Sequence, residues 1–368
     1  MRELAAYLRP GVGPCGDPVS GWPALLDIAA DHQLLPALWS ALHARGVRAL
    51  PEGVGGDRSP LRELERAHAI NAARVRDLRS QAVLVLDALD DAGIDAIAIK
   101  GLHWLLAGWQ RDPASRVLVD IDILIPRPLA RDAQRALELL GYAPVPGAPR
   151  DDLTLDHQLV ALAAPGHRGS VELHVAPIAP AYAKLLTADE LFDAAEVQII
   201  ERRERRLPNA THAMVLLIAH AQLQDGDARL LRLPLRALRD LAVLVDEGHG
   251  TADWDAVGGR FRGAGEHAAI GLAGFAAAAE ALFGLQIDVP RRRGAGWLHA
   301  TQWAIDHDRT ARTLREIVSL PRALRPERMH ELYGASGAAS VAAARVRHLS
   351  GGATRRIART LSRESATV

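Results

Sequence analysis

The sequence predicts an α/β (α+β) fold, in which helical regions at both ends of the chain flank a small mixed β-sheet. Apolar residues recur at helical spacing before residue 92 and after residue 203, whereas short strand-like and helical runs alternate in between. The length of 368 residues allows about two or three domains. We therefore expect an N-terminal helical region at 1–92, an α/β core at 93–202 and a C-terminal helical domain at 203–368.

Composition excludes several classes of protein. Lys and Arg together number 44, as do Asp and Glu, so the zero net charge argues against bulk electrostatic capture of nucleic acid. The single Cys15 excludes an internal disulfide framework and a cysteine-based zinc site. The N-terminus lacks the apolar core of a signal peptide, and the most apolar window, 268–285, is interrupted by glycine and glutamate. We expect a cytoplasmic protein without a membrane partner.

The N-terminal region is predicted to be helical. A helical pattern runs from Trp22 to Gly46 with a break at Pro36, and 50–60 is a loop. A long helix follows from about Leu61 to Ala92, and Gly93 is its expected C-cap. Its apolar stripe, which we assign to core packing, consists of Leu64, Ala67, Leu78, Ala82, Val85 and Leu89.

The stretch from Ile97 to Ile125 predicts a strand, a sharp turn at Gly101, a short helix, a loop and a second strand. In the second strand Asp120 and Asp122 project from one face, because side chains change face at every residue. Two neighbouring carboxylates repel each other, and an otherwise apolar strand has no packing use for them. A hard divalent cation would turn this repulsion into shared coordination.

The rest of the core alternates between helix and strand. We expect a helix that ends near Leu140, a strand at Tyr142–Val145, and a hairpin formed by His157–Ala163 and Ser170–Val175. In the last of these strands Glu172 and His174 share one face, opposite three apolar residues.

From Ala188 onward the chain is expected to be helical, apart from one strand at Val197–Ile200. The basic tail, 344–368, lacks aromatic residues and is interpreted as a solvated end rather than an anion-binding surface. The expected helices include Asn209–Gln224, Leu235–Glu247, Trp254–Phe261 and Glu266–Phe283.

Four motifs resemble the uncharacterised nucleotidyltransferase family of the DNA polymerase β-type superfamily, over roughly residues 80–255. They are Lys100-Gly101, Arg116-x-x-x-Asp120-x-Asp122, Gly141-Tyr142 and Val171-Glu172-Leu173-His174. The match also includes the downstream His220 on an apolar helix, Arg239-Asp240-Leu241, and Trp254-Asp255, which resembles the family's Asp-Trp ending. The Asp-x-Asp triplet is common by itself and becomes informative only in this setting.

The resemblance implies a nucleotidyltransferase core in which Asp120, Asp122 and Glu172 are catalytic and bind two Mg²⁺ ions. These ions would hold a nucleoside triphosphate (NTP) such as ATP, whose monophosphate (NMP) passes to a hydroxyl or similar acceptor with release of pyrophosphate.

Four further residues are candidate contacts of the nucleotide: Lys100, Gly101, Arg116 and His174. Gly101 would let backbone amides approach phosphate, and Lys100 and Arg116 would contact it directly. The broader superfamily usually has glycine or serine where this chain has Leu102, which offers no hydroxyl.

Each of these residues also has a purely structural alternative. The two aspartates could form a solvated strand face, and Glu172 could be an ordinary outward residue. His174 could be a partner of the acidic trio or a half-buried histidine. Lys100 could snorkel from a strand end and Arg116 could pair with Asp112.

Two rival functions stay open. The fold could serve as a catalytically inactive nucleotide- or partner-binding accessory protein, or water could be the acceptor, which would make the protein a phosphohydrolase. The zero net charge favours a small molecule or a protein, rather than nucleic acid, as the acceptor.

Overall fold

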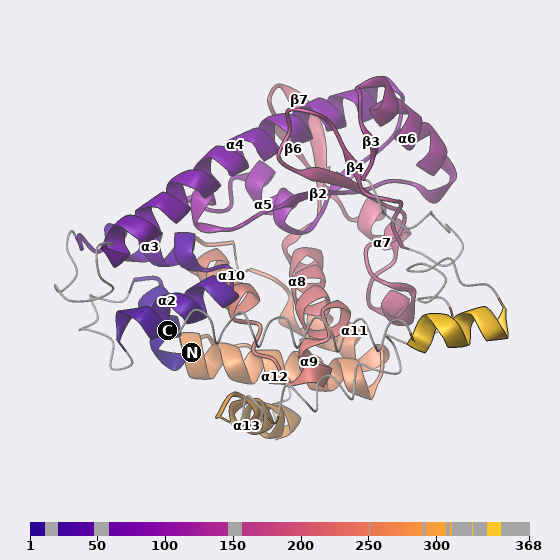
Figure 1. Cartoon of the computed structure of the whole chain (residues 1–368). Helices are drawn as coiled ribbons and strands as arrows, with labels where there is room; N and C mark the ends of the chain where they lie inside the picture. Colours follow the sequence, from indigo (N-terminus) through magenta and orange to yellow (C-terminus); the bar gives the residue numbers. More distant parts are fainter. Residues whose placement is uncertain are drawn as a thin grey trace. The chain divides into compact units, whose positions relative to one another are not determined.

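The structure is a computed structural model of the whole chain (Figure 1). It describes residues 1–11, 21–47, 59–145, 157–249, 251–289, 292–306 and 337–346, and the single positions 310 and 326. Contacts divide the chain into two compact units, 1–302 and 303–368, and the sheet belongs to the first. The predicted division at residues 92 and 202 stays a prediction, whereas the predicted loop at 50–60 and the basic tail lie largely outside the described residues.

The first unit contains one mixed sheet, as predicted, which lies beside α4 (Pro60–Asp91) (Figure 1). Its seven strands lie in the order β3-β4-β5-β2-β1-β7-β6. Their bounds are β1 Ile97–Ala98, β2 Asp120–Leu124, β3 Ala143–Pro144, β4 Leu162–Ala163, β5 Ser170–His174, β6 Glu196–Ile200 and β7 Arg203–Leu207. Strand β2 is parallel to β5 and antiparallel to β1, β1 is parallel to β7, and the predicted hairpin is present as the antiparallel pair β4–β5.

Helices cover the apolar face of this sheet. Helix α4 begins with a proline in its first turn, and its C-cap is Ala92, one residue before the expected Gly93. Gly93 follows the cap with a φ of +71°, the left-handed conformation that glycine tolerates. Ile121 and Ile123 of β2 pack in one cluster with the part of the α4 stripe from Leu78 to Leu89 and with α6 (Ala130–Leu139). The opposite face of β2 therefore carries the two aspartates.

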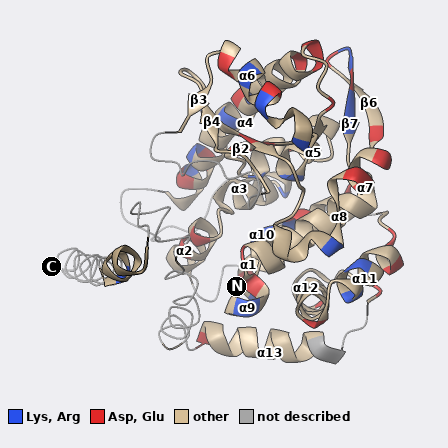
Figure 2. Ribbon diagram, turned by 90° about the vertical axis from the view of Figure 1, so that its right-hand side faces the viewer, with Lys and Arg blue, Asp and Glu red and all other residues tan. Residues whose placement is uncertain are grey.

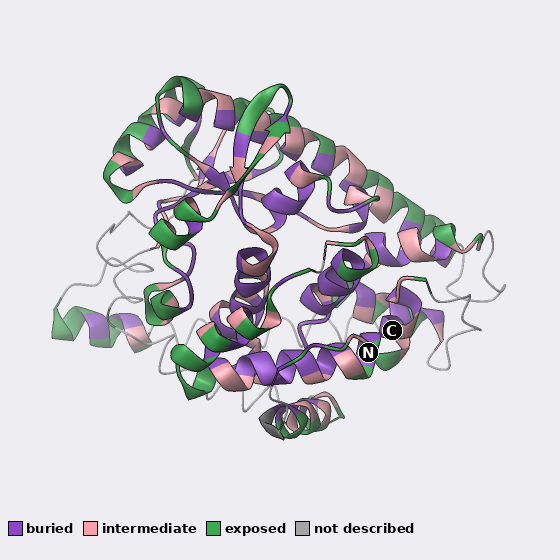
Figure 3. Ribbon diagram, turned by 180° about the vertical axis from the view of Figure 1, so that it is seen from behind, coloured by how far each residue is buried: buried purple, intermediate pink, exposed green. Residues whose placement is uncertain are grey.

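The remaining helices largely follow the predicted segments, and α8, α10 and α12 are mostly buried (Figure 3). Their bounds are α1 Arg2–Leu8, α2 Trp22–Asp31, α3 Leu35–Ala44, α5 Lys100–Ala107, α7 Ala188–Asp193, α8 Ala210–Ala219, α9 Asp227–Leu230, α10 Leu235–Asp246, α11 Trp254–Gly263, α12 Glu266–Phe283 and α13 Arg292–Asp306. A π-helical turn, His220–Gln224, continues α8, and three 3₁₀ turns are Pro113–Ser115, Arg127–Leu129 and Pro180–Leu185. No helix among the described residues is long and apolar enough to cross a bilayer.

The expectation that β6 is the only strand after Ala188 is wrong. Strand β7, with the sequence RERRL, pairs with both β6 and β1 although its arginines hide any apolar alternation (Figure 2). Arg205 is nevertheless buried, because Asp87 and Asp90 of α4 accept hydrogen bonds from its guanidinium. Paired charges thus replace the apolar residues that usually indicate a buried strand.

The predicted turn at Gly101 is also placed differently. Helix α5 begins at Lys100, so Gly101 lies within its first turn, and the residue with a positive φ, +54°, is Lys100. A left-handed conformation is unfavourable for a lysine and persists only where surrounding contacts hold it.

Candidate functional site

Two neighbouring strands bring the predicted acidic residues together. In the parallel pair β2–β5, Asp122 lies opposite Glu172 and Asp120 lies opposite Ser170. Because every second residue of a strand shares a face, Asp120, Asp122, Glu172 and His174 all project from the face opposite the apolar cluster. The predicted sharing of a face is therefore confirmed.

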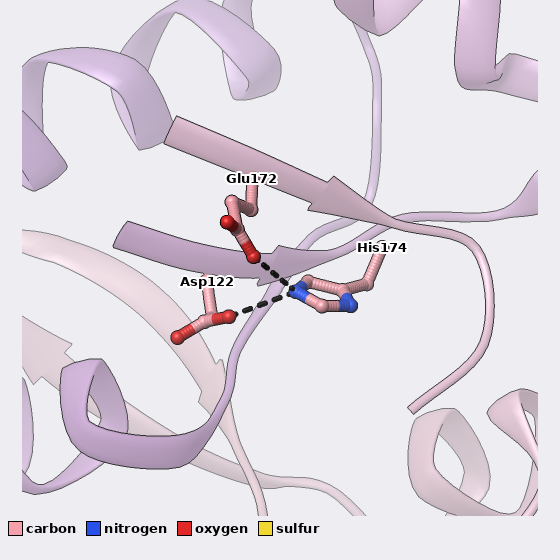
Figure 4. Close-up of side chains that lie close together, drawn as sticks. All are labelled: Asp122, Glu172 and His174. Carbon is pink, nitrogen blue, oxygen red and sulfur yellow. Dashed lines mark hydrogen bonds and ion pairs between the residues drawn. The ribbon is translucent and has the colours of Figure 1, made fainter. Parts of the chain in front are cut away.

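Asp122, Glu172 and His174 form the tightest group of this face (Figure 4). One donor atom from each lies within 4.8 Å of the other two. The Nε2 atom of His174 is 2.8 Å from Oδ1 of Asp122 and 3.7 Å from Oε2 of Glu172. Gln158 donates a hydrogen bond of 3.2 Å to the same Glu172 oxygen, so both carboxylates are oriented by neighbours.

Lys100 reaches this group from the start of α5. Its Nζ atom lies 2.6 Å from Oδ1 of Asp122 and 3.5 Å from Nε2 of His174. Only 15% of the Lys100 side chain and 4% of the Asp122 side chain are exposed, so water screens this ion pair weakly. Lys100 therefore contacts the site directly rather than snorkelling to solvent.

Gly101 allows Arg116 to lie against the first turn of α5. A Cβ atom at Gly101 would lie 2.1 Å from Nη1 of Arg116 and 2.6 Å from Cδ1 of Leu118, which no real side chain allows. The guanidinium of Arg116 stacks over the Trp104 ring at 4.9 Å and donates a 3.0 Å hydrogen bond to Asp240 of α10. Arg116 thus pairs with Asp240 and not with Asp112.

The ionisation of these groups follows from burial and mutual charge. Burial and the neighbouring Asp122 carboxylate raise the pKa of Asp120, and the same two causes raise the pKa of Glu172. Burial opposes ionisation of Asp122, but the hydrogen bond with His174 and the charge of Lys100 outweigh it and lower its pKa. Burial and Lys100 lower the pKa of His174 to about 4, so its imidazole is neutral at pH 7.

A pocket of about 200 Å³ opens beside these side chains, between the sheet and helices α8 and α10. Its floor includes both aspartates of β2, and Lys100 and Arg116 line the same wall. On the opposite side it is lined by residues of α8, the π-helical turn and α10. Charged side chains converge on this pocket from several elements, as in a site for a polar ligand.

The roles of the residues on the far wall of the pocket were not predicted. Trp104, whose side chain is buried, both supports Arg116 and lines the pocket. His220, 3.2 Å from Asp225 through its Nδ1 atom, lies in the π-helical turn, a feature frequent at functional sites. Asp240 belongs to the Arg239-Asp240-Leu241 part of the family resemblance, but its pairing with Arg116, 124 residues away in sequence, was not predicted. Leu102 is fully buried in the apolar core, which explains its side chain without any phosphate contact.

The comparison with protein families found a match over most of the chain. The model of a family described as uncharacterised nucleotidyltransferase matches residues 18–280. This range includes every predicted site residue and extends beyond the predicted 80–255 in both directions. Searches of curated proteins and of solved structures found no match.

Proposed function

Because the chain belongs to the uncharacterised nucleotidyltransferase family, we propose that it is a Mg²⁺-dependent enzyme that moves NMP from an NTP to an acceptor. The acceptor presents a hydroxyl or a similar group, and pyrophosphate is the second product. One observation carries the proposal. Asp120, Asp122 and Glu172 lie on one face of two adjacent strands, and both aspartates line the floor of the pocket.

The donor set fits a hard cation. Asp120, Asp122 and Glu172 offer carboxylate oxygens, which Mg²⁺ prefers to nitrogen or sulfur. His174 is better suited as their hydrogen-bond partner than as a ligand. If Nε2 bound a metal, the proton would have to sit on the buried Nδ1, which has no hydrogen-bond acceptor among the described residues.

The three carboxylates would therefore hold the metal, and His174 would orient Asp122. When bound, Mg²⁺ neutralises triphosphate charge and lowers the pKa of an acceptor hydroxyl. Ligation needs ionised carboxylates, and the lowered pKa of Asp122 keeps that group charged throughout the neutral range.

Two cations of the chain would bind the triphosphate. Arg116 is held by Asp240 and Trp104, so little side-chain entropy remains to be lost when it meets a phosphate. Lys100 reaches the same pocket from the first turn of α5. The acceptor would enter from the side of α8 and α10, where His220 and Arg236 supply polar groups.

The test separates binding from transfer. Calorimetry with each of the four NTPs and Mg²⁺ compares the wild type with an Asp120→Ala/Asp122→Ala variant. We expect Mg²⁺-dependent binding that the double substitution abolishes. NTP labelled at the α-phosphorus is then incubated with metabolite and protein fractions, and transfer of the label is measured together with pyrophosphate release.

Three results would contradict the proposal. A folded wild type that binds no nucleotide would indicate a partner-binding module of the same fold. Nucleotide binding without transfer of label to any fraction would indicate an inactive nucleotide-binding protein. Release of free NMP or inorganic phosphate without an acceptor would indicate a phosphohydrolase.

A further inference from the structure

Lys100 contacts Oδ1 of Asp122, one of the two carboxylate oxygens that this residue could offer to a metal ion. Its ammonium lies 2.6 Å from Oδ1 of Asp122, a distance at the short end of charge-assisted hydrogen bonds. The same oxygen is the one that faces His174. Asp122 is also the most buried of the three predicted metal-binding carboxylates, so a metal ion bound through Oδ1 would lie beside this ammonium.

The backbone directs Lys100 to this position. With φ at +54°, Lys100 is one of five non-glycine residues in the described part of the chain with a positive φ. The next residue, Gly101, packs directly against the side chains of Arg116 and Leu118, which leave no room for a Cβ atom. An unfavourable conformation that neighbouring contacts enforce at a site is a recognised sign of a functional constraint.

Charge explains what the ammonium does there. Asp120, Asp122 and Glu172 lie close together and partly buried, and Arg116 is already paired with Asp240. Lys100 is therefore the cation that pairs with Asp122 in this structure. A divalent ion on the same oxygen would be repelled by the ammonium, and a triphosphate in the pocket would offer that ammonium another anion.

Resting on the proposed function, we propose that Lys100 is a tethered cation that competes with the divalent metal for Asp122. Metal then binds well only when an incoming triphosphate draws the ammonium away, so that metal and nucleotide enter together. The nucleotide-free protein consequently has a weak metal site.

The experiment measures Mn²⁺ binding to the nucleotide-free protein by electron paramagnetic resonance, which reports free Mn²⁺. Lys100→Met removes the competing charge and is expected to raise Mn²⁺ affinity by at least about tenfold. Lys100→Arg retains the charge and is expected to stay as weak as the wild type. The exposed Lys184, the other lysine of the chain, supplies the matched control Lys184→Met, which is expected to change nothing. Adding Asp122→Asn to Lys100→Met should abolish the gain.

A second measurement needs no variant. Because the chain has two lysines, selective ¹⁵Nζ labelling gives an ammonium spectrum with one signal for each. We expect Mg²⁺ with a non-hydrolysable ATP analogue to shift the Lys100 signal and to leave that of Lys184 in place.

If the wild type and a folded Lys100→Met variant bind Mn²⁺ with equal affinity, the proposed competition is wrong, whereas the proposed metal site still stands. An unchanged Lys100 signal at saturating Mg²⁺ and nucleotide would overturn the competition equally. If neither wild type nor variant binds Mn²⁺ with or without nucleotide, the proposed function itself fails and the competition with it.

Discussion

At the scale of single residues, close packing rather than backbone freedom explains Gly101. The left-handed φ belongs to Lys100, and Gly101 lies in a helical turn where any Cβ would overlap Arg116. A glycine within a helix usually weakens it, so its presence here indicates that the close approach of the guanidinium outweighs that cost.

Gly101→Ala should therefore damage both stability and binding. The methyl group displaces Arg116 from Trp104 and Asp240, and we expect a loss of about 1–3 kcal/mol in the free energy of unfolding. Nucleotide affinity measured by calorimetry should fall as well. The matched control is Gly263→Ala, at the end of α11, where no atom lies within 4 Å of the added Cβ. This substitution should leave binding unchanged and stability equal or slightly higher. Wild-type affinity in Gly101→Ala would contradict the role of Arg116.

At the scale of elements, a helix or strand could be predicted where its own residue pattern determines its structure. Helix α4 has an apolar stripe and a glycine after its end, and β2 and β5 have alternating residues, so all three are recognisable alone. The acidic face could be predicted because strand alternation determines which side chains share a side. The roles of Asp240 and His220 in the far wall of the pocket could not be predicted, although both residues belong to the family resemblance, since these roles depend on helix packing that no local pattern encodes.

Strand β7 marks the limit of local pattern most clearly. Five residues with three arginines do not resemble a strand, and its place in the sheet depends on carboxylates of α4 that lie more than 100 positions earlier. Because this network contains one buried and one exposed arginine, β7 can be used to test how burial changes the contribution of an ion pair to stability.

Arg205→Met should destabilise the protein by about 1–3 kcal/mol, because Asp87 and Asp90 lose a partner whose side chain is only 4% exposed. Arg203→Met, on the same strand and facing the same helix, removes a side chain that is 43% exposed. This substitution should change the free energy of unfolding little. Urea unfolding of the two variants measures the difference. Equal losses would mean that burial does not distinguish the two arginines.

At the scale of the whole molecule, buried ionisable groups connect stability to pH. Burial and the nearby His249 lower the pKa of His103 in α5 to about 3, and its ring packs 4.3 Å from that of Trp109. Burial and the neighbouring Asp225 act in the opposite sense on Asp227, whose pKa is raised to about 7. Below pH 7 the His103 shift lowers the stability of the folded protein and the Asp227 shift raises it. The contribution of either residue is therefore measured by comparing the wild type with a variant that lacks that residue.

His103 is expected to contribute a loss of stability as pH falls. The unfolded chain takes up a proton near pH 6.5, whereas the folded protein does so only near 3, so the loss begins near 6.5 and is complete below 3. At pH 5 it amounts to roughly 2 kcal/mol relative to pH 8. Urea unfolding at several pH values gives the free energy of unfolding of the wild type and of His103→Leu. The contribution of His103 is the change with pH in the difference between these two free energies. His299→Leu, at an exposed histidine of α13, is the control and should show no such change. A constant difference between wild type and His103→Leu from pH 8 to 5 would show that His103 is not held neutral by its surroundings.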